Sequence, residues 1–125
     1  MDITPLVPEG RHVIESYDTD GFRINGERYP GPVIVWPEGV APWAVSDIAA
    51  AAIDTLDAMF AAEPPIEILL IGSGENFELA PPALRRALSE RRIAVESMDT
   101  GAACRTYNVL MAEDRRVAAA LLPAR

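Results

Sequence analysis

Polar residues that could bind a ligand are concentrated in two stretches of this 125-residue chain, residues 72–74 and 100–108. The first stretch, Gly72-Ser73-Gly74, follows an apolar run and resembles the start of a dinucleotide-binding fingerprint, in which backbone amides after a strand hold phosphates. The third glycine position of that fingerprint is Phe77, and Pro81-Pro82 remove amide donors where the next helix would begin. We therefore favour a tight turn after a strand over a nucleotide site.

The second stretch combines an arginine, hydroxyl groups and an amide near the start of a predicted helix. A guanidinium group and the first turn of a helix both favour anions, so this stretch could bind an anion or a carboxylate. In the alternative interpretation, which physics favours, Tyr107 packs in the core and Arg105 pairs with Asp99 or a neighbouring carboxylate. A ligand pocket between the two stretches would consist of Gly72, Ser73, Gly74, Thr100, Arg105, Thr106, Tyr107 and Asn108.

Two other features could carry chemistry, and for each we favour a structural role. Cys104 lies near a predicted helix start and beside Arg105, and both features lower a thiol pKa, but the single histidine, His12, is far away in sequence. Asp18 and Asp20 resemble a fragment of a calcium-binding loop whose later ligands are missing. Aspartates in such turns usually accept hydrogen bonds from local amides. We therefore assign no catalytic residue, metal ligand or cofactor.

Composition excludes several classes of function. The net charge of −8 disfavours nucleic acid and anionic membranes as partners. All eleven basic residues are arginine, so no lysine nucleophile or Schiff base exists, and one cysteine allows neither an internal disulfide nor a cysteine-rich zinc site. No run approaches the roughly 20 apolar residues of a membrane span. The acidic, proline-containing start lacks a targeting segment, which predicts a soluble cytoplasmic protein.

The elements that must position these residues follow from the apolar pattern. The run Ile66-Glu67-Ile68-Leu69-Leu70-Ile71 predicts a strand covered on both faces, at the centre of an α/β sheet. Asn25-Gly26 predicts a two-residue hairpin turn within an N-terminal β-meander. Further strands are predicted at residues 33–36, 93–98 and 117–122, and 38–44 is predicted to be a loop.

Three helices are expected between these strands. Helical spacing of apolar residues predicts an amphipathic helix of about four turns over residues 45–60, with Ser46 as N-cap. Pro81-Pro82 opens a shorter helix with Leu84 and Leu88 facing inward. Asp99 or Thr100 caps the third helix. The length predicts one compact domain over residues 1–125, with an extended lead-in at 1–11.

The chain resembles the small domain-of-unknown-function family that includes the mitochondrial assembly factor three of respiratory complex I. The resemblance runs from about residue 14 to residue 123. Its most specific part is the pattern T-x-x-A-x-R-T-Y-N-x-L over residues 100–110, and it includes Gly72-Ser73-Gly74 and Ile93-Ala94-Val95-Glu96. It implies a compact three-layer α/β fold with a mixed sheet and no established enzymatic activity. Because no mitochondrial targeting segment is found, we expect a bacterial relative.

Two functions therefore remain open. The first is a non-enzymatic binding module, an assembly or scaffold factor with a protein partner, because the resemblance implies this role and the residues form no convincing catalytic constellation. The second is a small-molecule or anion-binding protein, or an enzyme, that uses the pocket between the two stretches. In that case Arg105 would hold the anion while Ser73, Thr100 and Asn108 orient it. Homo-oligomerisation is also left open, through an apolar patch made by Phe22, Trp36 and Trp43.

Overall fold

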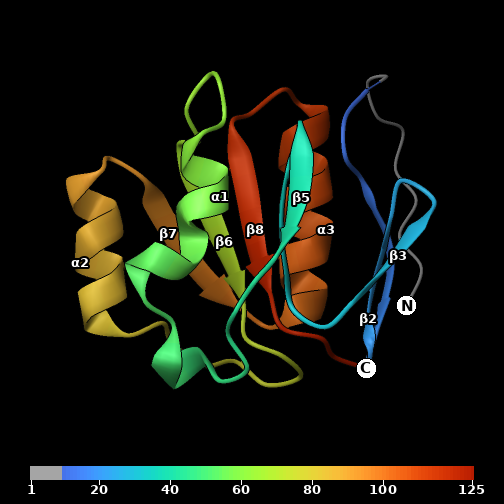
Figure 1. Ribbon diagram of the computed structural model, residues 1–125, viewed down its shortest axis with the longest axis horizontal. Coiled ribbons are helices and arrows are strands. Elements are labelled where there is room, and N and C mark those ends of the chain that lie inside the picture. Colours follow the sequence, from blue (N-terminus) through green and yellow to red (C-terminus); the bar gives the residue numbers. More distant parts are fainter. Residues whose placement is uncertain (1–9) are drawn as a thin grey trace.

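The computed structural model describes residues 10–125 (Figure 1). The lead-in predicted at residues 1–11 lies almost wholly outside the described residues. No helix in the described part of the chain is long and apolar enough to cross a membrane. The elements follow one another as β1 (Ile14–Asp18), β2 (Gly21–Ile24), β3 (Glu27–Pro30), β4 (Val33–Trp36), β5 (Gly39–Pro42), η1 (Ile48–Ala50), η2 (Ile53–Leu56), α1 (Asp57–Phe60), β6 (Ile68–Gly72), α2 (Pro82–Glu90), β7 (Ala94–Met98), α3 (Thr100–Ala112) and β8 (Val117–Leu121).

The predicted N-terminal β-meander is confirmed as an antiparallel sheet in the order β1-β2-β3. Its second turn contains Asn25 and Gly26 at φ +49° and +81°, as a two-residue hairpin turn requires. At the first turn, the Asp18 carboxylate accepts hydrogen bonds from the amides of Asp20 and Gly21 and from the Arg28 guanidinium. The Arg28 side chain, above all, holds the pKa of Asp18 well below its usual range. The turn aspartate thus has the local role that we favoured.

The second sheet is mixed and has the order β5-β4-β8-β6-β7. Strands β8, β6 and β7 run parallel, whereas β4 is antiparallel to both β8 and β5. Leu69, Leu70 and Ile71 of β6 are buried, which confirms the predicted strand covered on both faces, but the centre of the sheet is β8, and β6 lies between β8 and the edge strand β7. The strand predicted at residues 117–122 is confirmed as β8, which lies between β4 and β6.

Layers cover both faces of the five-stranded sheet (Figure 1). On one face, Leu69 and Ile71 belong to a core shared with Leu84 and Leu88 of α2. On the other face, Leu70 belongs to a second core, shared with α3 and the meander sheet. Alternate β6 side chains therefore enter different cores, as the two-residue period of a strand requires. These layers confirm the predicted three-layer α/β fold.

The predicted four-turn helix over residues 45–60 is wrong. The chain forms the two short 3-10 helices η1 and η2 and then the single turn α1, with extended backbone at Ala51 and Ala52 between them. Asp47, rather than Ser46, caps η1 by accepting a hydrogen bond from the amide of Ala49. The broken path buries Ile48, Leu56 and Met59 in the core with Trp43, whose indole N–H donates to Thr55. Tertiary packing here overrides the helix propensity of the alanines.

The loop predicted at residues 38–44 is also wrong, because it contains the edge strand β5. Residues Pro37 and Glu38 connect β4 tightly to β5, so that Trp36 pairs with Gly39. A Cβ atom at position 39 would lie 2.6 Å from Cζ2 of Trp36, so the pairing needs glycine here. Pro42 is tolerated because β5 lies at the sheet edge, where proline's missing N–H breaks no inner ladder. The strand was not predicted because glycine and proline, which are uncommon in strands, occupy its two ends.

Candidate functional site

Thr100 joins the two predicted stretches at the start of α3. Its hydroxyl accepts a hydrogen bond from the Gly74 amide (2.9 Å) and donates one to the Leu122 carbonyl (2.6 Å). The Thr100 amide in turn donates to the Gly74 carbonyl at 2.9 Å. Thr100 is fully buried, so these contacts hold the end of β6, the start of α3 and the residue after β8 together.

The loop after β6 is shaped by glycines and by Ser73. A Cβ atom at position 72 would lie 3.0 Å from Cα of Thr100, so a side chain there would push against the backbone of α3. Gly74 has φ +99°, which L-residues rarely adopt. The Ser73 hydroxyl accepts from the Glu78 amide at 2.9 Å and lies 2.8 Å from the Asn76 carbonyl. The predicted tight turn is therefore held by its own hydrogen bonds.

Tyr107 and Asn108 lie two turns further along α3 and are directed toward β1. The Tyr107 hydroxyl donates to the His12 carbonyl at 2.8 Å, and the Asn108 amide bonds to the backbone of Ile14 on both of its polar atoms. Both side chains are buried, and burial raises the pKa of Tyr107. The structure thus brings Gly72, Ser73 and Gly74 together with Thr100, but it uses Tyr107 and Asn108 to attach α3 to the meander sheet.

Arg105 is exposed on the outer side of α3, with Thr106 half-buried beside it. A Cβ atom added at Gly101 would lie 3.3 Å from Nη1 of Arg105, so the guanidinium lies over the preceding turn. Within residues 10–125 the guanidinium makes no hydrogen bond or ion pair. The predicted pairing with Asp99 is wrong, because Asp99 caps α3 by accepting from the Ala102 amide. Arg105 is the predicted pocket residue whose charged group remains available to a ligand.

Cys104 is fully buried within α3. Burial raises the pKa of its thiol to about 12, and the charge of Arg105 opposes this only in part. The structural role that we favoured for Cys104 is therefore confirmed, because a helix position close to the N-terminus lowers a thiol pKa only where the thiolate can be solvated.

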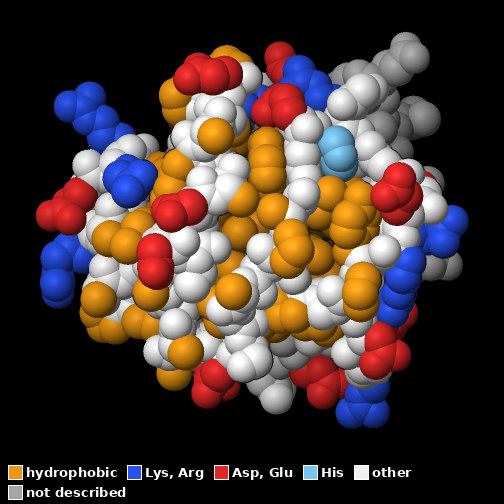
Figure 2. Space-filling model, in the orientation of Figure 1, with side chains coloured by type: hydrophobic (Ala, Val, Ile, Leu, Met, Phe, Trp, Pro, Cys, Tyr) orange, Lys and Arg blue, Asp and Glu red, His pale blue; other side chains and the backbone are white. Residues whose placement is uncertain are grey.

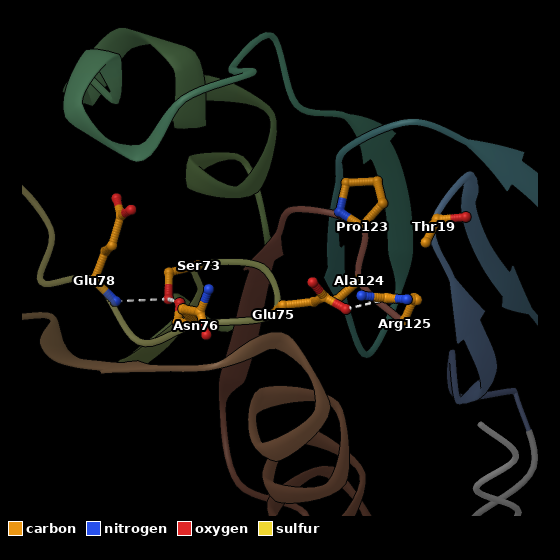
Figure 3. A pocket seen from close by; sticks show the side chains of 8 residues that line it. All are labelled: Thr19, Ser73, Glu75, Asn76, Glu78, Pro123, Ala124 and Arg125. Atoms are coloured by element: carbon orange, nitrogen blue, oxygen red, sulfur yellow. Dashed lines mark hydrogen bonds and ion pairs between the residues drawn. The ribbon is translucent and has the colours of Figure 1, made fainter.

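An open cavity of about 370 Å³ lies beyond the carboxyl end of β6 (Figure 3). Of the predicted pocket residues only Ser73 lines it, and the complete lining is Thr19, Ser73, Glu75, Asn76, Glu78, Pro123, Ala124 and Arg125. Glu75 and Arg125 point toward each other in Figure 3, and the Arg125 Nε donates to the Glu75 carboxylate at 2.6 Å. This ion pair lowers the pKa of Glu75. Across residues 10–125, no cluster of three or more His, Cys, Asp or Glu side chains could hold a metal ion.

The other residues that line this cavity could not be predicted from the sequence, because their types are those of an ordinary polar loop. The only available signal was their position, since ligands of open α/β sheets usually bind beyond the carboxyl ends of the strands.

Among residues 10–125, the most exposed large apolar residues are Phe77 and Leu79 in the β6–α2 loop and Val109 on α3, with exposed fractions of 60%, 54% and 54%. Leu79 also lines a second open groove of about 400 Å³, together with Ile48, Ala49, Glu78, Ala80, Pro81, Pro82 and Arg85. The predicted patch of Phe22, Trp36 and Trp43 is wrong, because Phe22 and Trp43 are buried in the two cores and Trp36 is half-buried.

The chain is similar in sequence to known proteins. The family model described as "Protein of unknown function (DUF498/DUF598)" matches residues 14–122. A Xenopus tropicalis protein named "NADH dehydrogenase [ubiquinone] 1 alpha subcomplex assembly factor 3" is 37% identical over 110 residues, which are 88% of this chain and 60% of the relative. The chain thus spans about three fifths of that relative's length.

Solved structures of bacterial proteins share the fold. The crystal structure of a Bartonella henselae protein, described as an outer membrane protein, has a TM-score of 0.82 at 38% identity and covers 93% of this chain and 98% of its own. The solution NMR structure of a Bordetella pertussis protein, described as an Mth938-like domain, has a TM-score of 0.77 at 31% identity, covering 98% and 92% respectively.

Proposed function

The chain belongs to the DUF498/DUF598 protein family, and from this membership we propose that it is a non-enzymatic binding module that holds another protein during assembly. The name of the Xenopus relative supports an assembly-factor-like role. The proposal concerns the part that the two chains share, since this chain spans about 60% of that relative.

The placement of Phe77 and Leu79 carries the proposal. Both side chains are large and apolar, and both are exposed in one loop beside an open groove. Most other large apolar side chains of the described residues are buried in the two cores. Exposed apolar residues grouped beside a groove are typical of surfaces that bind other proteins. The buried polar groups of Thr100, Tyr107 and Asn108, in contrast, are all hydrogen-bonded within the fold, which also favours a binding role over catalysis.

The proposal is tested by isolating the affinity-tagged chain from its host and identifying the proteins and metabolites that accompany it. We expect one protein that forms a stoichiometric complex when the two purified chains are mixed, as measured by size-exclusion chromatography with light scattering. If only a metabolite accompanies the chain, the binding-module proposal fails.

The cavity beyond β6 supports a second candidate, a small-molecule binder or an enzyme. It lies where ligands of α/β sheets usually bind. Its lining is net negative and disfavours an anion, because Glu75 is paired with Arg125 and Glu78 adds a carboxylate that has no ion pair among the described residues. Under this candidate a metabolite should raise the melting temperature of the protein. An Asn76→Leu variant removes the exposed side-chain amide from the lining with little change in shape, and it should abolish that rise in melting temperature. If the rise is unchanged in the variant, this cavity is not the ligand site.

A further inference from the structure

We propose that the groove between η1 and the start of α2 docks a basic polypeptide segment, which inserts an apolar side chain beside Leu79. This inference rests on the proposed protein-binding function and specifies its surface and the chemistry of its partner. The groove surface is defined here as Phe77 together with the lining residues Ile48, Ala49, Glu78, Leu79, Ala80, Pro81, Pro82 and Arg85.

The groove has an apolar floor and small walls. Ile48 and Ala80 are buried at its base, where they join the core that contains Leu84. Ala49 is exposed, and its methyl group is too small to fill the space above the floor. Pro81 and Pro82 have no backbone N–H, so this part of the rim presents no amide donor and suits apolar contact. In Figure 2, orange apolar side chains reach the surface at the lower left, where η1 and the start of α2 lie in Figure 1.

Hydrogen bonds on both sides of Leu79 hold its side chain in solvent. The Ser73 hydroxyl holds the Glu78 amide, and the Ser97 hydroxyl accepts from the Ala80 amide at 3.3 Å. Leu79 therefore lies between two anchored backbone positions, and its side chain is presented to solvent by a loop that is fixed on both sides. A preorganised apolar anchor loses little conformational entropy when a partner covers it.

Charge favours a basic partner. Glu78 lies in the groove surface, and the exposed Asp47 caps η1 beside it. Arg85 also lines the groove and keeps its positive charge, but it is half-buried and its Nε donates to the Ala80 carbonyl, so the exposed Glu78 and Asp47 outnumber it. The whole chain carries −8, so its field attracts a basic segment over a distance of about one Debye length, ~10 Å at 0.1 M salt. A second copy of this chain would bring another −8 to the same surface, and it is therefore disfavoured as the occupant.

Two synthetic peptides of twelve residues test this surface. Both contain the same pair of leucines, and they differ in flanking residues, which are four arginines in one peptide and four glutamates in the other. The ¹⁵N-labelled protein is titrated with each peptide, and amide shifts give the site and the Kd. We expect the arginine peptide to shift the amides of Ala49, Phe77, Leu79 and Ala80, and the glutamate peptide to shift none. Raising the salt concentration should weaken the binding.

Leu79→Ser and Val109→Ser form a matched pair of variants, because both side chains are 54% exposed and lie on different elements. Leu79→Ser should weaken binding of the arginine peptide about tenfold or more, as loss of an interface anchor does. Val109→Ser should change the Kd less than about twofold. An unchanged spectrum for all other residues shows that each variant remains folded.

Four results would overturn the inference: no shift with either peptide, equal binding of both, shifts centred on α3 or β7, or unchanged affinity in Leu79→Ser. The partner isolated from the host separates this inference from the function on which it rests. If the purified partner binds Leu79→Ser as tightly as the wild type, the groove is wrong but the binding function stands. If no protein partner exists, the function fails whatever the peptides do.

Discussion

The side-chain amide of Asn108 forms two hydrogen bonds with the backbone of Ile14, which lies 94 positions earlier in the chain. The Ile14 N–H donates to Oδ1 at 3.0 Å, and Nδ2 donates to the Ile14 carbonyl at 2.8 Å. An amide side chain offers one donor and one acceptor group, as a peptide unit does, so Asn108 substitutes for a neighbouring strand at the start of β1. The connection attaches the meander sheet to α3.

Replacing Asn108 by alanine should lower the free energy of unfolding by roughly 2–4 kcal/mol, because the buried N–H and C=O of Ile14 both lose their hydrogen-bond partner. Denaturation in urea would measure the loss. Asn108→Asp is the informative companion, because it keeps one acceptor and introduces a buried charge, and it should destabilise at neutral pH as well. A loss below about 0.5 kcal/mol in Asn108→Ala would show that the two hydrogen bonds contribute little.

Thr100→Val should destabilise the protein by about 1–3 kcal/mol, because valine has a similar shape but leaves the Gly74 amide and the Leu122 carbonyl without their partner. Thr100→Ser retains the hydroxyl and should be clearly more stable than the valine variant. Thermal and chemical denaturation of the serine and valine variants would separate the contribution of the hydrogen bonds to stability from that of side-chain packing. Equal stability of the serine and valine variants would contradict a structural role of this hydroxyl.

Arg105→Ala should change the free energy of unfolding by less than about 0.5 kcal/mol, because the guanidinium is exposed and makes no ion pair with the described residues. Arg116→Ala is the control, since that half-buried arginine binds Glu38 through two nitrogens and also the Pro64 carbonyl. We expect the control to be the less stable variant. If a stable Arg105→Ala protein loses its partner or a ligand, Arg105 has a binding role.

The Cys104 thiol should resist thiol reagents in the native protein at pH 8, because it is buried and its pKa is raised to about 12 from an ordinary value of 9.0. The unfolded chain releases this proton near pH 9, whereas the folded protein retains it until about pH 12. The stabilisation from the folded-state proton is therefore fully present below pH 9 and is lost as the pH rises toward 12.

Denaturation at a series of pH values from 8 to 11 would measure this loss. In Cys104→Ala the free energy of unfolding should fall less steeply with pH. Some decline should remain in the variant, because the pKa of Tyr107 is also raised by burial. Rapid thiol modification of the native protein at pH 8 would contradict the burial of Cys104.

Elements with strong local signals could be predicted from the sequence. The Asn25-Gly26 turn and the proline-led helix α2 each follow from two neighbouring residues, and the apolar strand β6 follows from one continuous run of six mostly apolar residues. The segment from Val45 to Phe60 could not be predicted, because its alanines fit a continuous helix as well as they fit the observed short helices. Contacts with Trp43 and the sheet determine its path. For the candidate site, the hypothesised pocket placed residues 72–74 near Thr100 correctly, but the directions of the Tyr107 and Asn108 side chains could not be predicted.

The class of the fold, the order of most elements and the excluded chemistries follow from the sequence, because apolar period, turn residues and charge are properties of neighbouring positions or of the whole composition. Which side chains remain available to a ligand or partner depends on tertiary packing. Burial turned Cys104 into a core residue, distant backbone groups occupied Tyr107 and Asn108, and the anchored loop after β6 left Leu79 in solvent. Each of these outcomes depends on atoms that are far apart in the chain and meet only when the sheet and α3 pack together.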